Sequence, residues 1–290
     1  MSEVTLVWDA VAQLGEGPLW VDAENAVYWV DIVQHNVHRL SLGSSAKQTW
    51  HVDDQLTGLG LRERGGFVTT TRHGLAFVDF EQGALTPIAD VEPHVPDNRF
   101  NDAKVDPAGR FWAGTMATDE RSATGSLYRL DTDLRVSAVD DGYIIANGPA
   151  FSPNGETMFH TDSAKRVIYT FDLQPSGAIS NKQEFVRFEA PELGAPDGMT
   201  VDADGCLWVC HFGGSRITRF SPAGDVLQVV PMPVPNVTSC TFGGANLDTL
   251  YITTARVGMT EAELANHPTA GGLFSFQPGV RGLPTPRFTG

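Results

Sequence analysis

Short apolar runs separated by polar turn segments recur along the whole chain. Gly17–Val21 is followed by a turn and then Ala26–Val30, and Met199–Val201 is followed in the same way by Leu207–Cys210. Aromatic residues concentrate in the second run of such pairs, for example Trp29. Aromatic and β-branched residues fit a pleated, half-buried surface. The pattern therefore predicts antiparallel strand pairs, with helix indicated only over Thr260–Asn266, where Thr260 is a candidate N-cap.

The turn segments return at nearly even intervals. They end at Asn25, Gly65, Gly109, Gly155, Gly205 and Asp248, at intervals of 40, 44, 46, 50 and 43 residues. Intervals of this size are typical of propeller blades. The sequence predicts an all-β, six-bladed β-propeller with a central metal site, formed by one domain over residues 1–290. Thr5–Trp8 is expected to pair with the last blade and close the ring.

Polar residues share one phase in these repeats. Eight positions before the turn ends lie Thr57, Asn101, Asn147, Asp197 and Cys240, and nine positions before the first lies Glu16. Equivalent positions of a radially repeated fold converge on its axis, so Glu16, Asn101, Asn147 and Asp197 are predicted to form one central site. Asn147-Gly and Asp197-Gly are also natural turn dipeptides, which leaves a turn open as the alternative.

A second ring of polar residues follows the turns by six positions. Its members are Asp31, Thr71, Thr115, Thr161, His211 and Thr254, with Arg72, Asp162 and Arg256 nearby. Packed strand ends would favour Val or Ile instead. We therefore expect this ring to border an open, substrate-sized pocket, although Asp31, Asp162 and His211 could equally serve the structure alone.

Two carboxylates and two amides on one axis indicate a divalent cation. Oxygen ligands favour Ca²⁺, Mg²⁺ or Mn²⁺, while Fe²⁺ and Zn²⁺ stay open. Three or four protein ligands leave coordination positions for water and substrate, which is the arrangement of a catalytic site.

Charge and motifs narrow the function further. A net charge of −15 disfavours nucleic acid and anionic membranes as partners. The N-terminus has no signal-peptide pattern and no run reaches 18 apolar residues, so a cytoplasmic protein with three reduced cysteines is expected. The motifs of zincins, serine hydrolases and Walker-type nucleotide sites are absent from the sequence.

Several segments together resemble the SMP-30/gluconolactonase/regucalcin family, and within it the bacterial sugar lactonases such as xylonolactonases. They include Leu14–Pro18, Arg99–Gly109, Trp112–Met116, Phe159–Asp162 and Pro196–Gly198. The resemblance implies a six-bladed propeller that binds one divalent metal and hydrolyses aldonolactones to open-chain acids.

The resemblance also implies roles for individual residues. Glu16, Asn147 and Asp197 match the metal ligands of the family, and Arg99 and Asn101 match its substrate contacts. Asp119 falls where some relatives have a substrate-facing glutamate, although the loop 117–124 differs.

For the mechanism, Asp197 is the first candidate for the general base, because a carboxylate beside the metal can take a proton from the attacking water. The expected partner is a small sugar lactone, in a monomer or small homo-oligomer. Two alternatives stay open, a phosphotriesterase-like hydrolase on the same fold and a non-catalytic propeller whose metal is structural.

Overall fold

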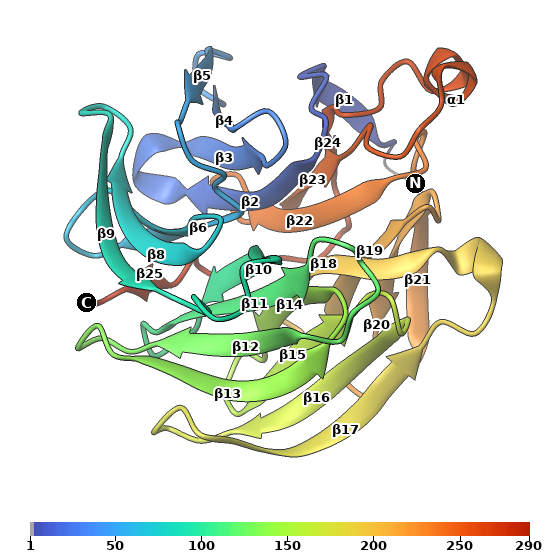
Figure 1. The fold of residues 1–290 in the computed structure, drawn as a ribbon. Helices are drawn as coiled ribbons and strands as arrows, with labels where there is room; N and C mark the ends of the chain where they lie inside the picture. Colours follow the sequence, from blue (N-terminus) through green and yellow to red (C-terminus); the bar gives the residue numbers. More distant parts are fainter. Residues whose placement is uncertain (1–2) are drawn as a thin grey trace.

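In residues 3–290, which the computed structural model describes, 25 strands form six sheets around one axis (Figure 1). Five sheets have four strands and one has five, and within each blade consecutive strands pair antiparallel. The first strands of neighbouring sheets contact one another around the whole ring. The predicted all-β six-bladed propeller is confirmed.

The blades follow chain order, with the innermost strand first. The first three blades contain β2 (Gly15–Val21), β3 (Ala26–Asp31), β4 (Asn36–Ser41) and β5 (Lys47–His51); β6 (Gly58–Arg62), β7 (Phe67–Thr70), β8 (Gly74–Asp79) and β9 (Ala84–Asp90); and β10 (Asn98–Val105), β11 (Phe111–Ala117), β12 (Gly125–Leu130) and β13 (Val136–Tyr143). The last three contain β14 (Ala146–Phe151), β15 (Thr157–Asp162), β16 (Val167–Leu173) and β17 (Ile179–Arg187); β18 (Ala195–Val201), β19 (Leu207–Phe212), β20 (Arg216–Phe220) and β21 (Val226–Pro231); and β22 (Val237–Gly243), β23 (Thr249–Thr254), β24 (Leu273–Phe276) and β1 (Thr5–Trp8).

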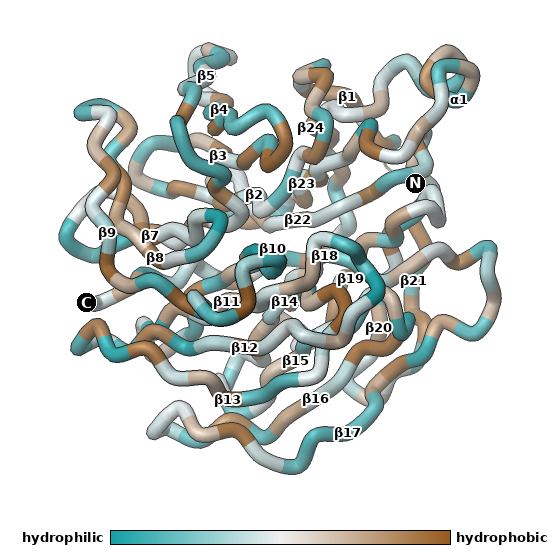
Figure 2. Tube along the Cα trace, in the orientation of Figure 1, coloured by the Kyte–Doolittle hydropathy of each residue, from teal (hydrophilic) through white to brown (hydrophobic). Residues whose placement is uncertain are grey.

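The hydrophobic core lies between adjacent blades. The indole rings of Trp29, Trp112 and Trp208 occupy the second strands of three blades and are at most 1% exposed. The outer strands face solvent, and hydrophilic stretches follow β13 and β17 in Figure 2. Exposed strands such as β13 and β17 carry little apolar signal, so these outermost strands were not predicted from the apolar runs.

Two terminal segments close the ring. β1 pairs antiparallel with β24, as predicted, so that the last blade combines both ends of the chain. The C-terminal β25 (Arg287–Phe288) pairs in parallel with β6, and residues 283–286 line a cavity together with residues of several inner strands. This second closure was not predicted, because a two-residue strand leaves no periodic pattern.

Helices are short. The predicted helix is α1 (Glu261–Asn266), and the Thr260 hydroxyl and the Glu263 carboxylate form a capping box at its start. Two 3₁₀ turns, η1 (Asp22–Glu24) and η2 (Pro191–Leu193), complete the helical elements of the described chain. No helix in residues 3–290 combines the length and apolar character needed to cross a membrane.

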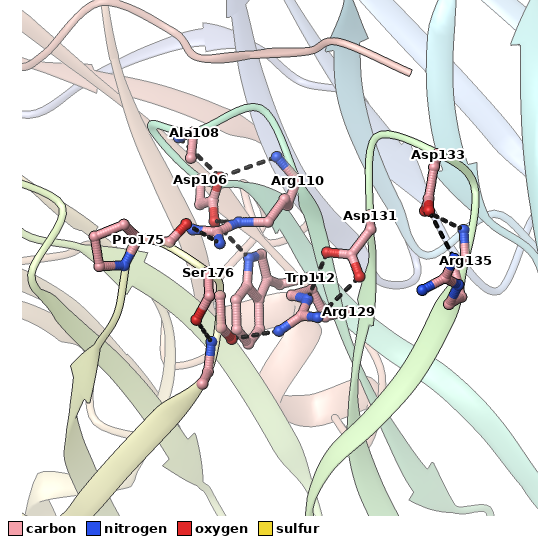
Figure 3. A network of polar contacts seen from close by, with 12 residues as sticks. Asp106, Ala108, Arg110, Trp112, Arg129, Asp131, Asp133, Arg135, Pro175 and Ser176 are labelled. Carbon is pink, nitrogen blue, oxygen red and sulfur yellow. Dashed lines mark hydrogen bonds and ion pairs between the residues drawn. The ribbon is translucent and has the colours of Figure 1, made fainter.

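Buried aspartates organise two of the repeated turns. The Asp106 carboxylate accepts hydrogen bonds from the Arg110 backbone and guanidinium and from the Trp112 indole, at 2.6–2.9 Å (Figure 3). Asp202 accepts equivalent bonds from Trp208 and Arg219. Each carboxylate thus links a turn to the tryptophan six residues later, inside the core.

We expect Asp106→Asn to lower the free energy of unfolding by about 2–3 kcal/mol, because an amide keeps the shape but leaves buried donors without a charged acceptor. Urea denaturation measures the loss. The matched control is Asp133→Asn, whose ion pair with Arg135 is exposed and should contribute less than about 0.5 kcal/mol. Equal losses in the two variants would contradict the assignment of Asp106.

Candidate functional site

The four residues predicted at the axis lie where the inner strands lose their regular pairing. Register shifts fall between Glu16 and Leu19, Phe100 and Ala103, Asn147 and Ala150, and Pro196 and Met199. An extra residue in one strand bends it and re-aims its side chains. These irregular segments are the structural basis of the shared phase in the sequence, and they belong to strands rather than to turns.

A cavity of about 200 Å³ opens at these segments. Glu16, Arg99, Asn101, Asn147 and Asp197 line it together, so the structure brings these five predicted residues to one place. Apolar side chains of Leu14, Met116, Ile145, Phe212 and Val257 also line it. The carboxylates of Glu16 and Asp197 lie deep, since each residue is only 6% exposed.

A chain of hydrogen bonds fixes the amides. Arg99 Nη1 donates to Asn101 Oδ1 at 2.8 Å, and Asn101 Nδ2 donates to Asn147 Oδ1 at 3.0 Å. Asn147 Nδ2 donates to Ser163 Oγ, which in turn donates to the carbonyl of Pro196. The series runs through three blades and ends beside Asp197. It orients each side chain before any ligand arrives.

Burial dominates the electrostatics. Desolvation, with the nearby charge of Asp102, raises the pKa of Glu16 to about 8, although the Gly17 amide donates to its carboxylate. Desolvation and the charge of Glu16 raise the pKa of Asp197 well above its usual range. The centre of the channel therefore contains carboxylates that are unfavourable as anions without a compensating cation.

Asp102 is a functional candidate that the sequence reasoning missed. Its carboxylate is buried next to this site, where it accepts hydrogen bonds from the Gly148 and Ala103 amides at 2.8 Å. Desolvation raises its pKa as well. Lys104 reaches across the channel and donates to the Met199 carbonyl at 2.6 Å. Only the Asn101-Asp102 dipeptide signalled this residue, and the repeat phase selected its neighbour.

Asp119 is not brought to the cavity. Its exposed carboxylate accepts hydrogen bonds from the Arg121 and Ser122 amides and caps a turn. The next residue, Glu120, has φ of 55° and lines the cavity. The turn therefore shifts the acidic side chain that faces the site by one residue, which the sequence of the loop did not reveal.

The residues of the second polar ring are not among those that line this cavity. Asp31 accepts hydrogen bonds from the amides of Gln13 and Leu14, and Asp162 accepts them from Ile144 and Ile145. Each carboxylate holds the segment that enters an inner strand. The expectation that these residues border the pocket was wrong, because strand ends also need polar groups to satisfy the backbone of adjoining loops.

His211 is part of the wall structure. Its ring stacks on Phe188 with 4.4 Å between ring centroids, and its Nδ1 lies 2.7 Å from the Leu193 carbonyl. Burial lowers the pKa of His211 to about 4. His211 is therefore a neutral side chain packed into the wall of its blade.

Glycines allow the inner strands to approach. A Cβ at Gly198 would lie 2.2 Å from Ser239 Oγ, so β18 and β22 pack too closely for a side chain. Gly17 has φ of 52°, a conformation that favours glycine. Both glycines follow a carboxylate of the site directly, and they explain why Glu16 and Asp197 stand in turn-like sequences inside strands.

The donor chemistry of the site fits a hard divalent cation. In residues 3–290 no three His, Cys, Asp or Glu side chains are grouped as a metal site. The candidate set instead combines the carboxylates of Glu16 and Asp197 with the oriented amide oxygen of Asn147. Oxygen donors of this kind suit Ca²⁺ or Mg²⁺, and a cation would relieve the repulsion between the two carboxylates.

In metal-free protein, Glu16→Gln should remove part of the pH dependence of stability. The pKa of Glu16 lies at about 8 in the folded protein and near 4.5 when exposed, so its contribution to stability is lost as pH rises from 4.5 towards 8. The slope approaches about 1.4 kcal/mol per pH unit. Urea unfolding in chelator from pH 5 to 8.5 should show a flatter curve for Glu16→Gln than for exposed Glu81→Gln. Parallel curves would contradict the pKa shift.

Known proteins resemble this chain in sequence and in fold. The family described as SMP-30/Gluconolactonase/LRE-like region matches residues 14–256. The chain is 36% identical to a 6-deoxy-6-sulfogluconolactonase of Pseudomonas putida, over 96% of this chain and 95% of that protein. It is 38% identical to regucalcin of Gallus gallus, over 96% and 95% of the two chains. A solved calcium-binding protein, regucalcin of Agrobacterium tumefaciens, superimposes with a TM-score of 0.94 at 25% identity, over 99% and 97% of the chains. The chain therefore belongs to the SMP-30/gluconolactonase family.

Proposed function

We propose that this protein is a divalent-metal-dependent lactonase that hydrolyses a sugar lactone to the open-chain aldonic acid. The observation that carries the proposal is the joint position of two buried carboxylates, two oriented amides and Arg99 in one open cavity of about 200 Å³. The relative named 6-deoxy-6-sulfogluconolactonase supports a lactone as substrate. The relative described as calcium-binding supports a divalent metal.

Glu16, Asn147 and Asp197 would hold the metal, because their oxygens are the hard donors at the deep end of the cavity. When bound, a divalent ion supplies a Lewis acid for the lactone carbonyl. The hydrogen bond from Asn101 fixes the position of Asn147 Oδ1 in the cavity that both residues line. Little rearrangement is then needed on binding.

Asp197 is the proposed general base. Its buried carboxylate lies in the same cavity as Arg99 and Asn101, so it can meet a water placed beside a bound substrate. Asp197 takes a proton from the water that attacks the carbonyl carbon. The ester bond to the ring oxygen then breaks, and that oxygen becomes a hydroxyl by taking the proton from Asp197, which returns to the carboxylate.

Arg99 and Asn101 are the proposed substrate contacts. Arg99 Nη1 donates hydrogen bonds to the Phe100 carbonyl and to Asn101 Oδ1, both at 2.8 Å. These bonds fix the guanidinium plane beside the cavity. The remaining N–H groups can donate to sugar hydroxyls. Glu120 replaces Asp119 in our proposal as the acidic residue that faces the substrate.

Asp197→Asn should retain the fold and lose about 10³-fold in kcat at saturating metal, because the amide cannot accept the proton. A pH-indicator assay on a panel of aldonolactones measures turnover, and circular dichroism checks the fold. Asp204→Asn, whose side chain is 65% exposed in the turn after the same strand, should behave as wild type. Full activity of Asp197→Asn would sink the assignment of the base.

Metal removal distinguishes a catalytic ion from a structural one. We expect chelation to abolish lactone hydrolysis while cooperative unfolding persists, and re-addition of Ca²⁺, Mn²⁺ or Zn²⁺ to restore turnover and raise Tm. Loss of activity only together with unfolding would support a structural metal. Turnover of phosphotriesters but not of lactones would favour a different hydrolase on this fold.

A further inference from the structure

A buried polar cluster lies beside the cavity and has no part in the proposed chemistry. Its centre is Glu92, which is 8% exposed although its carboxylate forms no salt bridge within residues 3–290. Glu92 Oε1 accepts hydrogen bonds from the Thr115 and Tyr128 hydroxyls at 2.9 Å. Glu92 Oε2 accepts one from Asn98 Nδ2 at 2.8 Å. A carboxylate accepts hydrogen bonds but donates none, so the contact with Glu92 fixes which end of the Asn98 amide is its NH₂ group.

Asn98 holds a loop. Its Nδ2 donates to the Thr124 carbonyl at 3.0 Å, and the Thr124 hydroxyl donates to Asn98 Oδ1 at 2.7 Å. The other end of the loop is fixed where the Thr118 amide donates to the Asp97 carbonyl at 2.9 Å. Both ends of the segment 118–124 are therefore attached to the residues directly before Arg99. The segment is otherwise exposed to solvent.

This loop carries Glu120 to the cavity. The side chain of Glu120 is exposed whereas Glu16 and Asp197 lie deep, so Glu120 occupies the mouth. Its charge also acts on Arg99: burial lowers the pKa of Arg99, and Glu120 is the strongest of the carboxylates that oppose this effect. Among the described residues that line the cavity, Arg99 is the one basic side chain, against three carboxylates.

The excess of carboxylates over basic side chains in the cavity affects which lactones can bind. An anionic group at the far end of a lactone would meet the Glu120 carboxylate at the mouth, where two like charges a few ångströms apart repel. Removing the charge of Glu120, or letting its loop move, should therefore favour anionic lactones over neutral ones.

We propose that Asn98 is a positioning residue: oriented by Glu92, it holds the loop 118–124 so that Glu120 faces the cavity and disfavours lactones with an anionic substituent. The inference rests on the proposed lactonase function for its substrate and on the hydrogen bonds above for its geometry. Asn98 acts only through Glu120, so its effect on selectivity must vanish when Glu120 is neutral.

The test compares wild type, Asn98→Leu, Glu120→Gln and the double variant, all saturated with metal. The ratio of kcat/KM for 6-deoxy-6-sulfogluconolactone to that for gluconolactone is measured for each. Glu120→Gln should raise the ratio by roughly tenfold, the size of one charge interaction near a protein surface. Asn98→Leu should raise the ratio in the same direction, and the double variant should match Glu120→Gln alone.

A merely structural role predicts another pattern. Asp106→Asn, the destabilised control at the opposite end of β10, should lower Tm and leave the ratio unchanged. An unchanged ratio in Asn98→Leu, or a double variant that exceeds Glu120→Gln, would overturn the proposal. Thr124→Val removes a single hydroxyl donor and serves as the second variant if Asn98→Leu does not fold.

Hydrogen exchange separates this proposal from the proposed function. Amides of residues 118–124 should exchange faster in Asn98→Leu than in wild type and remain unchanged in Glu120→Gln. Unchanged exchange in Asn98→Leu would refute the attachment of the loop whatever the substrate. Faster exchange in a protein whose wild type hydrolyses no lactone would refute the lactonase function alone.

Discussion

Buried carboxylates at the axis of a closed ring are the constraint around which this molecule is organised. Glu16, Asp102 and Asp197 are all nearly inaccessible to water, and desolvation raises the pKa of each. Such groups are costly unless they are paired, hydrogen-bonded or bound to a cation. The protein holds them in place with irregular inner strands and with glycines that admit close packing. Burying these carboxylates lowers the stability of the fold, a cost that is common where residues are held in position for a function.

The sequence revealed the parts of the fold that repeat. Turn spacing predicted six blades, and the shared phase of Glu16, Asn101, Asn147 and Asp197 predicted their convergence. The structure explains why this worked: each residue lies at the same irregular segment of an inner strand, so that one local device recurs at one position of the repeat. Without the repeat, the dipeptides Asn147-Gly and Asp197-Gly would have been interpreted as turns.

Features that depend on contacts between blades were not predictable. Ser163 bonds to the Pro196 carbonyl and Asp102 to the Gly148 amide, each on a neighbouring blade, and neither residue stands at the phase of the metal-binding candidates. The loop around Asp119 was ambiguous because one turn decides which of two adjacent acids faces the cavity. The roles of Asp31 and His211 stayed open in the sequence, because polar residues at strand ends can serve adjoining loops as well as a pocket. A single domain over residues 1–290 and a cytoplasmic location stay predictions.

Crystals grown with Mn²⁺ and an aldonate product would test the central claim most directly, since anomalous scattering locates the metal independently of the protein density. The account predicts one strong peak bonded to oxygens of Glu16, Asn147 and Asp197, with the product carboxylate beside it and Arg99 within hydrogen-bond distance. A metal peak elsewhere in the molecule, or a product bound away from Asp197, would contradict it.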